Sequence, residues 1–233
     1  MAGRGRRFIG AGIGTPKMLI PVRGRLMIDW ALDGLSFVPK KDIVFVVLRE
    51  HDEEFRLGEV LRSHFGGVQV CAIPGVTQGQ ACTVAAARSH YSPSEPIAIF
   101  NTDTYFSSPT LEKSLGALGK SCDGVIGVFR SASPDYSYAS IGKGGLVARV
   151  EEKNVISEWA TSGLYAFSRA SDFLSALDGA MLEKDCPRGE YYVGPLYNRL
   201  IAKGARIAPD RCSQLHDLGT PEKLKKFEAA RLP

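Results

Sequence analysis

The sequence has no long hydrophobic run, and this absence excludes two classes of protein. No apolar stretch reaches the ~18 residues that a membrane-spanning helix requires, so we expect no membrane span. The amino-terminal segment also lacks the apolar core of a secretory signal peptide. Its arginines and its shortage of acidic residues resemble a transit peptide only weakly. We therefore expect a cytoplasmic protein.

Cysteine is scarce and shows no pairing pattern. The cysteines are odd in number and no two are close in sequence; they are Cys71, Cys82, Cys122, Cys186 and Cys212. Neither a zinc site nor a disulfide framework has this spacing. We expect these residues to be reduced thiols in the core of the protein.

A strong excess of one charge is also missing. The chain carries 29 basic and 25 acidic residues, a net charge of +4, and three of the arginines stand in the opening loop. This distribution provides no basic stripe for nucleic acid, so we expect no nucleic-acid partner. With 233 residues, 44% of them hydrophobic, the chain can bury the core of one large domain. We predict a single domain over residues 1–233 with two halves that meet near residue 120.

What the sequence does contain is an opening rich in glycine and arginine. Gly3 and Gly5 leave their backbone N–H groups uncovered, and Lys17 adds a positive charge behind Pro16. The arginines of this loop are Arg4, Arg6 and Arg7. Bare amides beside fixed cations suit a polyphosphate, so the loop predicts binding of a nucleoside triphosphate. The alternative is a solvated basic tail.

Strand-like and helix-like segments alternate in the first half of the chain. Continuous apolar runs, which are typical of strands buried on both faces, occupy residues 43–48, 68–73 and 97–100. Helical patterns occupy residues 26–35, 51–64 and 80–90. This alternation indicates a parallel sheet flanked by helices.

Beyond residue 120 the strands follow one another more closely. They are expected at residues 125–129, 138–141, 146–150 and 164–167. Helices are expected at residues 170–177, 194–203 and 221–230. Thr220 as cap and Pro221 in the first turn predict the start of the last helix.

Two aspartates are candidates for binding a metal. Asp103 follows the strand at 97–100, and open α/β sheets bind ligands at the carboxyl ends of their strands. Asp217 stands just before the last helix. Magnesium takes one or two carboxylates together with phosphates and water, so two converging aspartates would bind it. As alternatives, Asp103 caps a turn and Asp217 only supports the start of the helix.

A third charged cluster, Glu151-Glu152-Lys153, ends the strand at 146–150. Its lysine is long enough to reach a phosphate, and a glutamate accepts hydrogen bonds from sugar hydroxyls. The alternative is a solvated surface, where alternating charges are common.

Taken together, these segments resemble the sugar nucleotidyltransferases, the nucleoside-diphosphate-sugar pyrophosphorylases. The matching blocks stand in family order over nearly the whole chain; they read MAGRGRRF, TPKMLIPV, RGRLMIDW, IFNTDTYF, VARVEEK, TSGLYAF and HDLGTPEKL. The resemblance implies a Rossmann-like three-layer α/β/α sandwich with a mixed, mostly parallel sheet, the GT-A-like fold of nucleotide-diphospho-sugar transferases. It also implies a nucleotide-binding first half and a sugar-binding second half.

The resemblance implies an enzyme that transfers a nucleotidyl group from a nucleoside triphosphate to a sugar 1-phosphate, with Mg²⁺ as cofactor. Residues with catalytic roles would be Arg7, Lys17 and Asp103, and the metal ligands would be Asp103 and Asp217. Residues that bind the nucleotide would be Ala2, Gly3, Gly5, Gln78 and Gly79. Residues that bind the sugar phosphate would be Glu152, Lys153, Ser162 and Gly163.

The sequence departs from the family pattern at several places. The family has a buried strand before the glycine-rich loop, and this strand is expected to be missing here. Met18 stands where proline is usual, and Ala139 stands where many members have glycine. We expect no hexapeptide-repeat domain of the kind that bifunctional relatives carry.

Three other functions stay open from the sequence. The first is a catalytically impaired nucleotide-binding relative, and the second is a phosphocholine-type cytidylyltransferase on the same scaffold. The third, a metal-dependent glycosyltransferase, is disfavoured because Asn101-Thr102-Asp103 stands where an Asp-x-Asp motif would be expected. The base, the sugar and the oligomeric state cannot be predicted, although an oligomer is possible.

Overall fold

The computed structural model describes residue 3 and residues 5–230. The chain forms two compact units, each built from separate stretches of sequence. The first unit takes the chain up to Val76, the segment Asn101–Ser107 and the chain from Gln214 onward. The second unit takes Thr77–Phe100 and Ser108–Ser213. The single domain over residues 1–233, with its nucleotide-binding half and its sugar-binding half, stays a prediction.

The second unit is built on a six-stranded mixed sheet, in the order β11-β7-β10-β8-β9 with β5 also paired to β10. The strands are β5 (Ile97–Ile99), β7 (Gly124–Arg130), β8 (Tyr138–Ile141), β9 (Val147–Glu151), β10 (Trp159–Phe167) and β11 (Ile207–Arg211). Strand β11 runs parallel to β7, and the other pairs of this sheet are antiparallel. The sheet is therefore mixed, as predicted.

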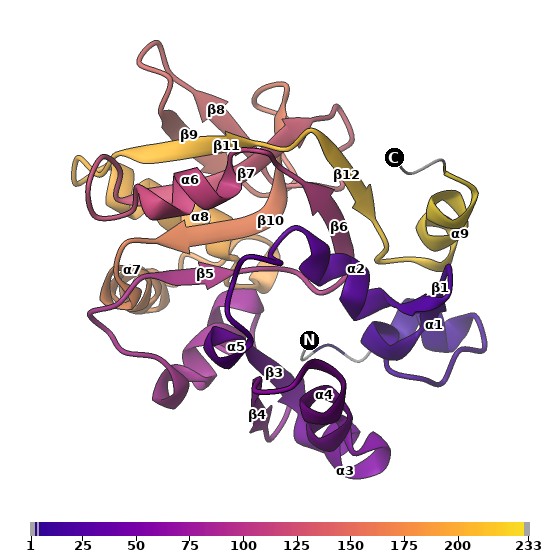
Figure 1. Ribbon diagram of the computed structural model, residues 1–233. Helices are drawn as coiled ribbons and strands as arrows, with labels where there is room; N and C mark the ends of the chain where they lie inside the picture. The colour runs from indigo at the N-terminus through magenta and orange to yellow at the C-terminus, as the bar shows by residue number, and fades with distance from the viewer. Residues whose placement is uncertain (1–2, 4, 231–233) are drawn as a thin grey trace. The chain divides into compact units, whose positions relative to one another are not determined.

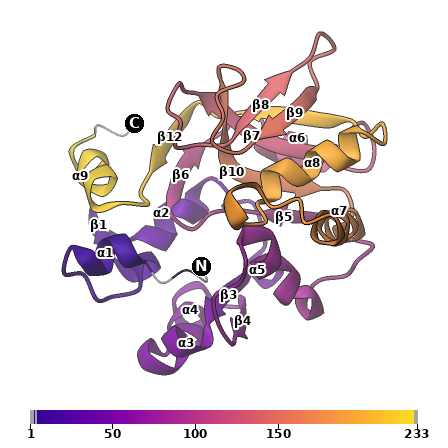
Figure 2. The same ribbon diagram turned by 180° about the vertical axis from the view of Figure 1, so that it is seen from behind.

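Helices cover both faces of this sheet. Helix α6 (Leu111–Gly116) lies on one face, and α7 (Ala170–Leu182) and α8 (Val193–Ile201) lie on the other, as Figures 1 and 2 show. Alternation along the strands explains both contacts, because successive side chains point to opposite faces. Val125 packs toward α6, whereas its neighbour Ile126 joins the core beneath α7 and α8. The second unit by itself thus has the predicted three layers. Helix α5 (Gln80–Ala86) packs against α7.

The first unit holds three pairs of short strands. Strand β3 (Val44–Leu48) runs parallel to β4 (Gln69–Ile73), as the sequence predicted for this part of the chain. Strands β1 (Pro21–Val22) and β2 (Arg25–Leu26) form a hairpin, and β6 (Thr104–Ser107) pairs antiparallel with β12 (Gln214–Asp217). The helices of this unit are α1 (Arg6–Gly10), α2 (Met27–Asp33), α3 (Arg49–Phe55), α4 (Leu57–Phe65) and α9 (Pro221–Ala229).

An aromatic cluster joins distant parts of the first unit. Trp30 of α2 meets Tyr105 of β6 and Phe227 of α9 edge-on, with ring centroids 5.7 and 5.1 Å apart. Phe227 is buried among residues that include Phe8 and Leu218. Because aromatic side chains bury large apolar areas, this cluster holds α1, α2, β6 and α9 in one core.

Several elements differ from the sequence prediction. The helix expected over 51–64 is two helices, since Arg56 has a left-handed backbone with φ of 53°. Strand β10 begins at Trp159, earlier than expected, and β5 pairs antiparallel with it. Strands β6, β11 and β12 were not predicted because their residues show neither an apolar run nor a clear alternating pattern. Thr220 caps α9 as predicted, accepting a hydrogen bond from the Lys223 N–H.

Short 3₁₀ turns complete the described chain at Lys17–Leu19, Lys40–Asp42, Arg88–His90 and Pro187–Gly189. All five cysteines are free thiols. In the part of the chain that the structure describes, no helix combines the length and the apolar character needed to cross a membrane.

Candidate active site

The pairing of β6 with β12 brings the two candidate aspartates together in the first unit. Asp217, the last residue of β12, lies opposite Thr104, the first residue of β6. The Leu218 N–H donates to the backbone oxygen of Asp103 at 2.8 Å, so the ladder continues to the residue before Thr104. Strands β6 and β12 lie side by side (Figure 1), and this pairing makes Asp103 and Asp217 neighbours at one end of the ladder.

Gly219 leaves open the space on which both carboxylates converge. A Cβ atom at this glycine would lie 3.0 Å from Oδ2 of Asp103 and 3.0 Å from Oδ1 of Asp217. Two carboxylate oxygens directed at one small space form a donor set that suits a hard cation such as Mg²⁺. Among the described residues, no group of three or more His, Cys, Asp and Glu side chains forms a metal site. The residues present thus fit a metal held by two aspartates that completes its shell with phosphate or water.

Each of these aspartates is also paired with a lysine. Lys17 Nζ lies 2.6 Å from Oδ2 of Asp103, and Lys223 Nζ lies 2.7 Å from Oδ2 of Asp217. Burial is the largest single effect on the pKa of Asp103 and raises it, but the charge and the hydrogen bond of Lys17, together with smaller effects, bring the pKa below its ordinary value. The backbone beside Lys17 is anchored by Met18, whose side chain is buried in the unit.

The opening loop lies beside this pair of carboxylates. One pocket of the first unit is lined by residues of the opening segment and by three residues from later in the chain. The first group is Gly5, Arg7, Phe8 and Lys17, and the second is Val76, Asp103 and Gly219. Gly5 has a φ of 62° and precedes the short helix α1, so the predicted loop is partly helical. Arg7 and Gly3 are exposed. Ala2, predicted to bind the nucleotide, and Arg4 lie outside the described residues.

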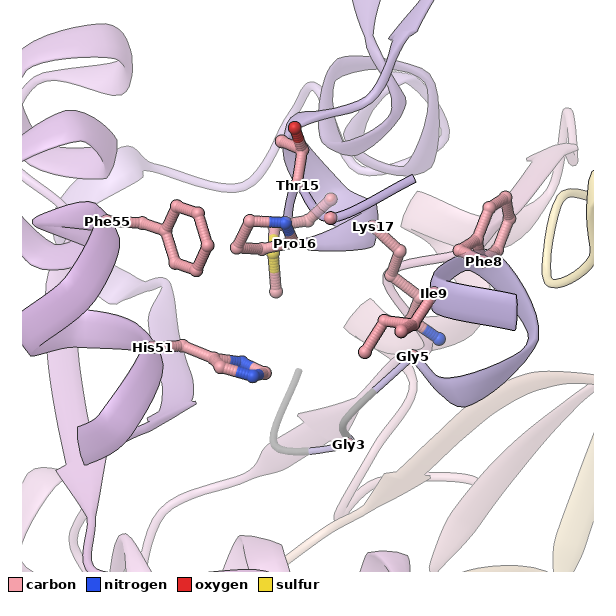
Figure 3. A pocket seen from close by; sticks show the side chains of 11 residues that line it. Gly3, Gly5, Phe8, Ile9, Thr15, Pro16, Lys17, His51 and Phe55 are labelled. Carbon is pink, nitrogen blue, oxygen red and sulfur yellow. The ribbon is translucent and has the colours of Figure 1, made fainter. Parts of the chain in front are cut away.

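A second pocket of the first unit lies between the loop and α3. Figure 3 shows His51 and Phe55 on one side of it and Phe8 and Ile9 on the other. His51 was not predicted as a site residue. Its Nδ1 atom is buried and has no hydrogen-bond partner in the part of the chain that the structure describes. A ligand or water in this pocket would supply that partner.

The predicted sugar-phosphate residues lie in the second unit. Glu152 accepts a hydrogen bond from the Ser137 hydroxyl, and burial raises the pKa of Glu152. Lys153 has a φ of 51°, and its Nζ lies 5.9 Å from the centre of the Tyr192 ring. The left-handed backbone at Lys153 turns the chain at the end of β9, so these two neighbouring side chains have different partners.

Ser162 and Gly163 lie inside β10, where its register against β7 shifts between Thr161 and Tyr165. Gly163 has a φ of 82°, which explains the glycine at this bulge. The Ser162 side chain is buried, and a Cβ at Gly127 would lie only 2.2 Å from its hydroxyl oxygen. Ser162 thus packs against β7, and a role of its side chain in sugar binding stays a prediction.

Gln78 and Gly79, two of the predicted nucleotide-binding residues, lie against the segment before α8. The Tyr191 N–H donates to the Gln78 backbone oxygen at 2.8 Å. Gly79 has a φ of 118°, and a Cβ there would lie 2.6 Å from the backbone nitrogen of Tyr191. The glycine is therefore required by close packing of two backbones, whereas the Gln78 side chain is exposed.

The family pattern of the MobA-like NTP transferase domain matches residues 1–171. The chain belongs to this family. The predictions of a nucleotidyltransferase family and of an enzyme of this class are thereby confirmed at the level of the family.

Individual relatives of this MobA-like NTP transferase agree with the assignment. A glucose-1-phosphate thymidylyltransferase of Mycobacterium tuberculosis is 26% identical over 88% of this chain and 70% of its own. The bifunctional protein GlmU of Kineococcus radiotolerans is also 26% identical, but this chain spans only 42% of its length. A nucleoside-diphosphate-sugar pyrophosphorylase of Vibrio cholerae has 26% identity and a TM-score of 0.83, with 99% of this chain and 98% of that chain covered. The predicted fold is confirmed by this structural match.

Four residues that lie beside the predicted site residues of this transferase were not assigned a role from the sequence. Gly219 and Lys223 stand in the block HDLGTPEKL, but only tertiary contacts reveal what they touch. Near Glu152, the buried hydroxyls of Thr161 and Tyr165 lie 2.8 Å apart, and burial raises the pKa of Tyr165 to about 12. Nothing in the spacing of these residues indicates that they meet.

The raised pKa of Glu152 predicts a pH-dependent stability for this transferase. The folded protein holds a proton on Glu152 at pH values where the unfolded chain has already lost it. The stability contributed by this carboxyl is therefore complete below its ordinary pKa of 4.5 and is lost as the pH rises through the folded value. Replacing Glu152 with glutamine should stabilise the protein increasingly as the pH rises above 4.5, until the carboxyl is ionised in the folded protein too, as urea unfolding would measure.

Glu112→Gln is the matched control for this measurement, because Glu112 is exposed in the same unit. Its effect on the free energy of unfolding should change little over the same pH range. Equal pH trends for the two variants would show that burial of Glu152 does not raise its pKa.

Proposed function

We propose that this protein is a Mg²⁺-dependent nucleotidyltransferase that joins a nucleoside triphosphate to a sugar 1-phosphate, giving a nucleoside diphosphate sugar and pyrophosphate. The observation that carries the proposal is the convergence of Asp103 and Asp217 on the open space at Gly219, with Lys17 beside them. Two carboxylates and a cation suit a metal–triphosphate unit, since phosphoryl transfer depends mainly on positioning and charge neutralisation.

The proposed roles in the first unit follow from charge. Asp103 and Asp217 would hold Mg²⁺, which neutralises phosphate charge when bound. Lys17 would bind a phosphate oxygen of the nucleotide, and Arg7 and the amides of Gly3 and Gly5 would bind the rest of the triphosphate. Asp103 orients Lys17 through their 2.6 Å contact, so the ammonium is held near the site before substrate arrives.

The acceptor requires little proton chemistry. The attacking group is a phosphate oxygen of the sugar 1-phosphate, which is already an anion, and it attacks the α-phosphorus while pyrophosphate leaves. Repulsion between the two anionic reactants is the main barrier, and Lys17 and Arg7 reduce it. Lys153 would bind the phosphate of the acceptor and Glu152 its sugar hydroxyls. Gln78 and Gly79 would contact the base.

A pyrophosphate-release matrix tests this proposal. Each of the common nucleoside triphosphates is combined with several sugar 1-phosphates and with phosphocholine, in Mg²⁺ and in EDTA. We expect release of pyrophosphate with at least one sugar 1-phosphate, and its loss in EDTA. Release with phosphocholine alone would identify a cytidylyltransferase of the phosphocholine type. Nucleotide binding without release from any pair would identify a catalytically impaired relative and refute the proposal.

A further inference from the structure

The two candidate metal ligands have no net charge when their lysine partners are included. Lys17 and Asp103 form one pair at 2.6 Å, and Lys223 and Asp217 form the other at 2.7 Å. All four side chains are largely withdrawn from solvent, with exposed fractions between 21% and 28%. Water therefore screens these pairs less than it would screen ion pairs on the open surface.

One further basic side chain lines the pocket beside these pairs. Arg7, which lines the same pocket, interacts electrostatically with Glu222 in the first turn of α9. Within the described chain no third acidic, histidine or cysteine side chain completes a metal site here. A free divalent cation would thus meet two carboxylates whose charge two ammonium groups already neutralise.

The two lysines contact their aspartates differently. The Asp103 oxygen nearest Gly219 is Oδ2, the same atom that Lys17 holds. The Asp217 oxygen nearest Gly219 is Oδ1, which accepts from the Gly219 N–H at 2.8 Å, and Lys223 holds the other oxygen. Lys17 therefore occupies the Asp103 oxygen that faces Gly219, whereas Lys223 does not occupy the Asp217 oxygen that faces Gly219.

We propose that Lys223 is a positioning residue that keeps this site neutral, so that the divalent cation binds together with the triphosphate and only weakly without it. The inference rests on the proposed function for its metal–triphosphate ligand. When a triphosphate enters, its negative charge attracts Lys17 away from Asp103 and restores a negative environment for the cation. Lys223 remains on Asp217 and keeps Oδ1 directed at Gly219.

Binding of Mn²⁺ to the nucleotide-free protein tests this inference without any turnover. The fraction of free Mn²⁺ is measured by electron paramagnetic resonance for the wild type and for Lys223→Met. We expect Lys223→Met to bind Mn²⁺ at least about tenfold more tightly, because one repelling charge near the cation is removed. Adding Asp217→Asn to Lys223→Met should abolish the gain, which would locate the ion at Asp217.

Lys225→Met is the matched control, since Lys225 is exposed on the same helix and the change in net charge is the same. Its affinity for Mn²⁺ should equal that of the wild type. Melting in EDTA verifies that each variant is folded, and Lys223→Gln replaces Lys223→Met if the methionine variant does not fold. Unchanged or weaker binding by the Lys223 variant, or an equal gain in Lys225→Met, would overturn the inference.

The outcome is independent of the pyrophosphate-release matrix. Tighter Mn²⁺ binding by Lys223→Met in a protein that releases no pyrophosphate would support the neutral site and refute only the proposed reaction. Pyrophosphate release together with unchanged Mn²⁺ binding would support the proposed reaction and refute the role of Lys223.

Discussion

Asparagine in place of Asp103 is expected to lower the rate of pyrophosphate release by about 100-fold or more. The change keeps the size of the side chain but removes the negative charge that faces Gly219 and that holds Lys17 at 2.6 Å. Even groups that only support a metal ligand typically contribute about 10- to 100-fold, so loss of a ligand should cost at least as much. Steady-state kinetics with the best substrate pair would measure the effect, which should fall mainly on kcat/KM.

Asp178→Asn provides the control for this variant, because it makes the same chemical change at another position. Asp178 is exposed on α7 and lies far from both Asp103 and Asp217 in sequence. It should keep full activity. Circular dichroism of Asp103→Asn should match the wild type, since Asp103 is half-buried and Asn retains the hydrogen-bonding shape. Full turnover by a folded Asp103→Asn would remove Asp103 from the proposed machinery.

Alanine in place of Gly79 is expected to destabilise the protein by roughly 2–4 kcal/mol, whatever nucleotide it binds. The added Cβ would lie 2.6 and 2.7 Å from the backbone nitrogen and oxygen of Tyr191, and backbone atoms cannot rotate away as a side chain would. The φ of 118° adds strain, because residues with a Cβ rarely adopt it. Urea unfolding followed by fluorescence would measure the loss.

Gly116→Ala is the matched control in the same unit. A Cβ at Gly116 would meet nothing within 4 Å, and this glycine lies at the end of α6. Its replacement should leave the protein equally or slightly more stable. If Gly79→Ala unfolds like the wild type but binds nucleotide weakly, the predicted contact with the base accounts for this glycine and the packing explanation is wrong.

The alternation of elements in the first half could be predicted because buried strands and amphipathic helices leave local patterns. The runs at 43–48 and 68–73 became the parallel pair β3 and β4 for this reason. Residues 51–64 also carry a helical pattern, yet Arg56 interrupts the helix with a left-handed backbone. A pattern of hydrophobic spacing contains no information on the φ of a single exposed residue.

The sequence pattern also does not predict which residues far apart in the chain meet in the candidate site. Asp103 and Asp217 could be chosen from their positions near strand and helix ends, but their proximity depends on β6 and β12, which are four residues each. These strands show neither an apolar run nor a clear alternation, and their pairing becomes visible only with the tertiary contacts of Trp30 with Tyr105 and Phe227.

The sequence by itself determined the family, the class of enzyme and the chemical types available for the site, because these depend on residue identity and order along the chain. Only the tertiary structure decided that both carboxylates face the gap at Gly219, that each has a lysine partner, and that Gly79 packs on Tyr191. The physical reason is that contacts between residues far apart in sequence are set by packing of whole elements, and distances of a few ångströms in that packing decide which charges meet.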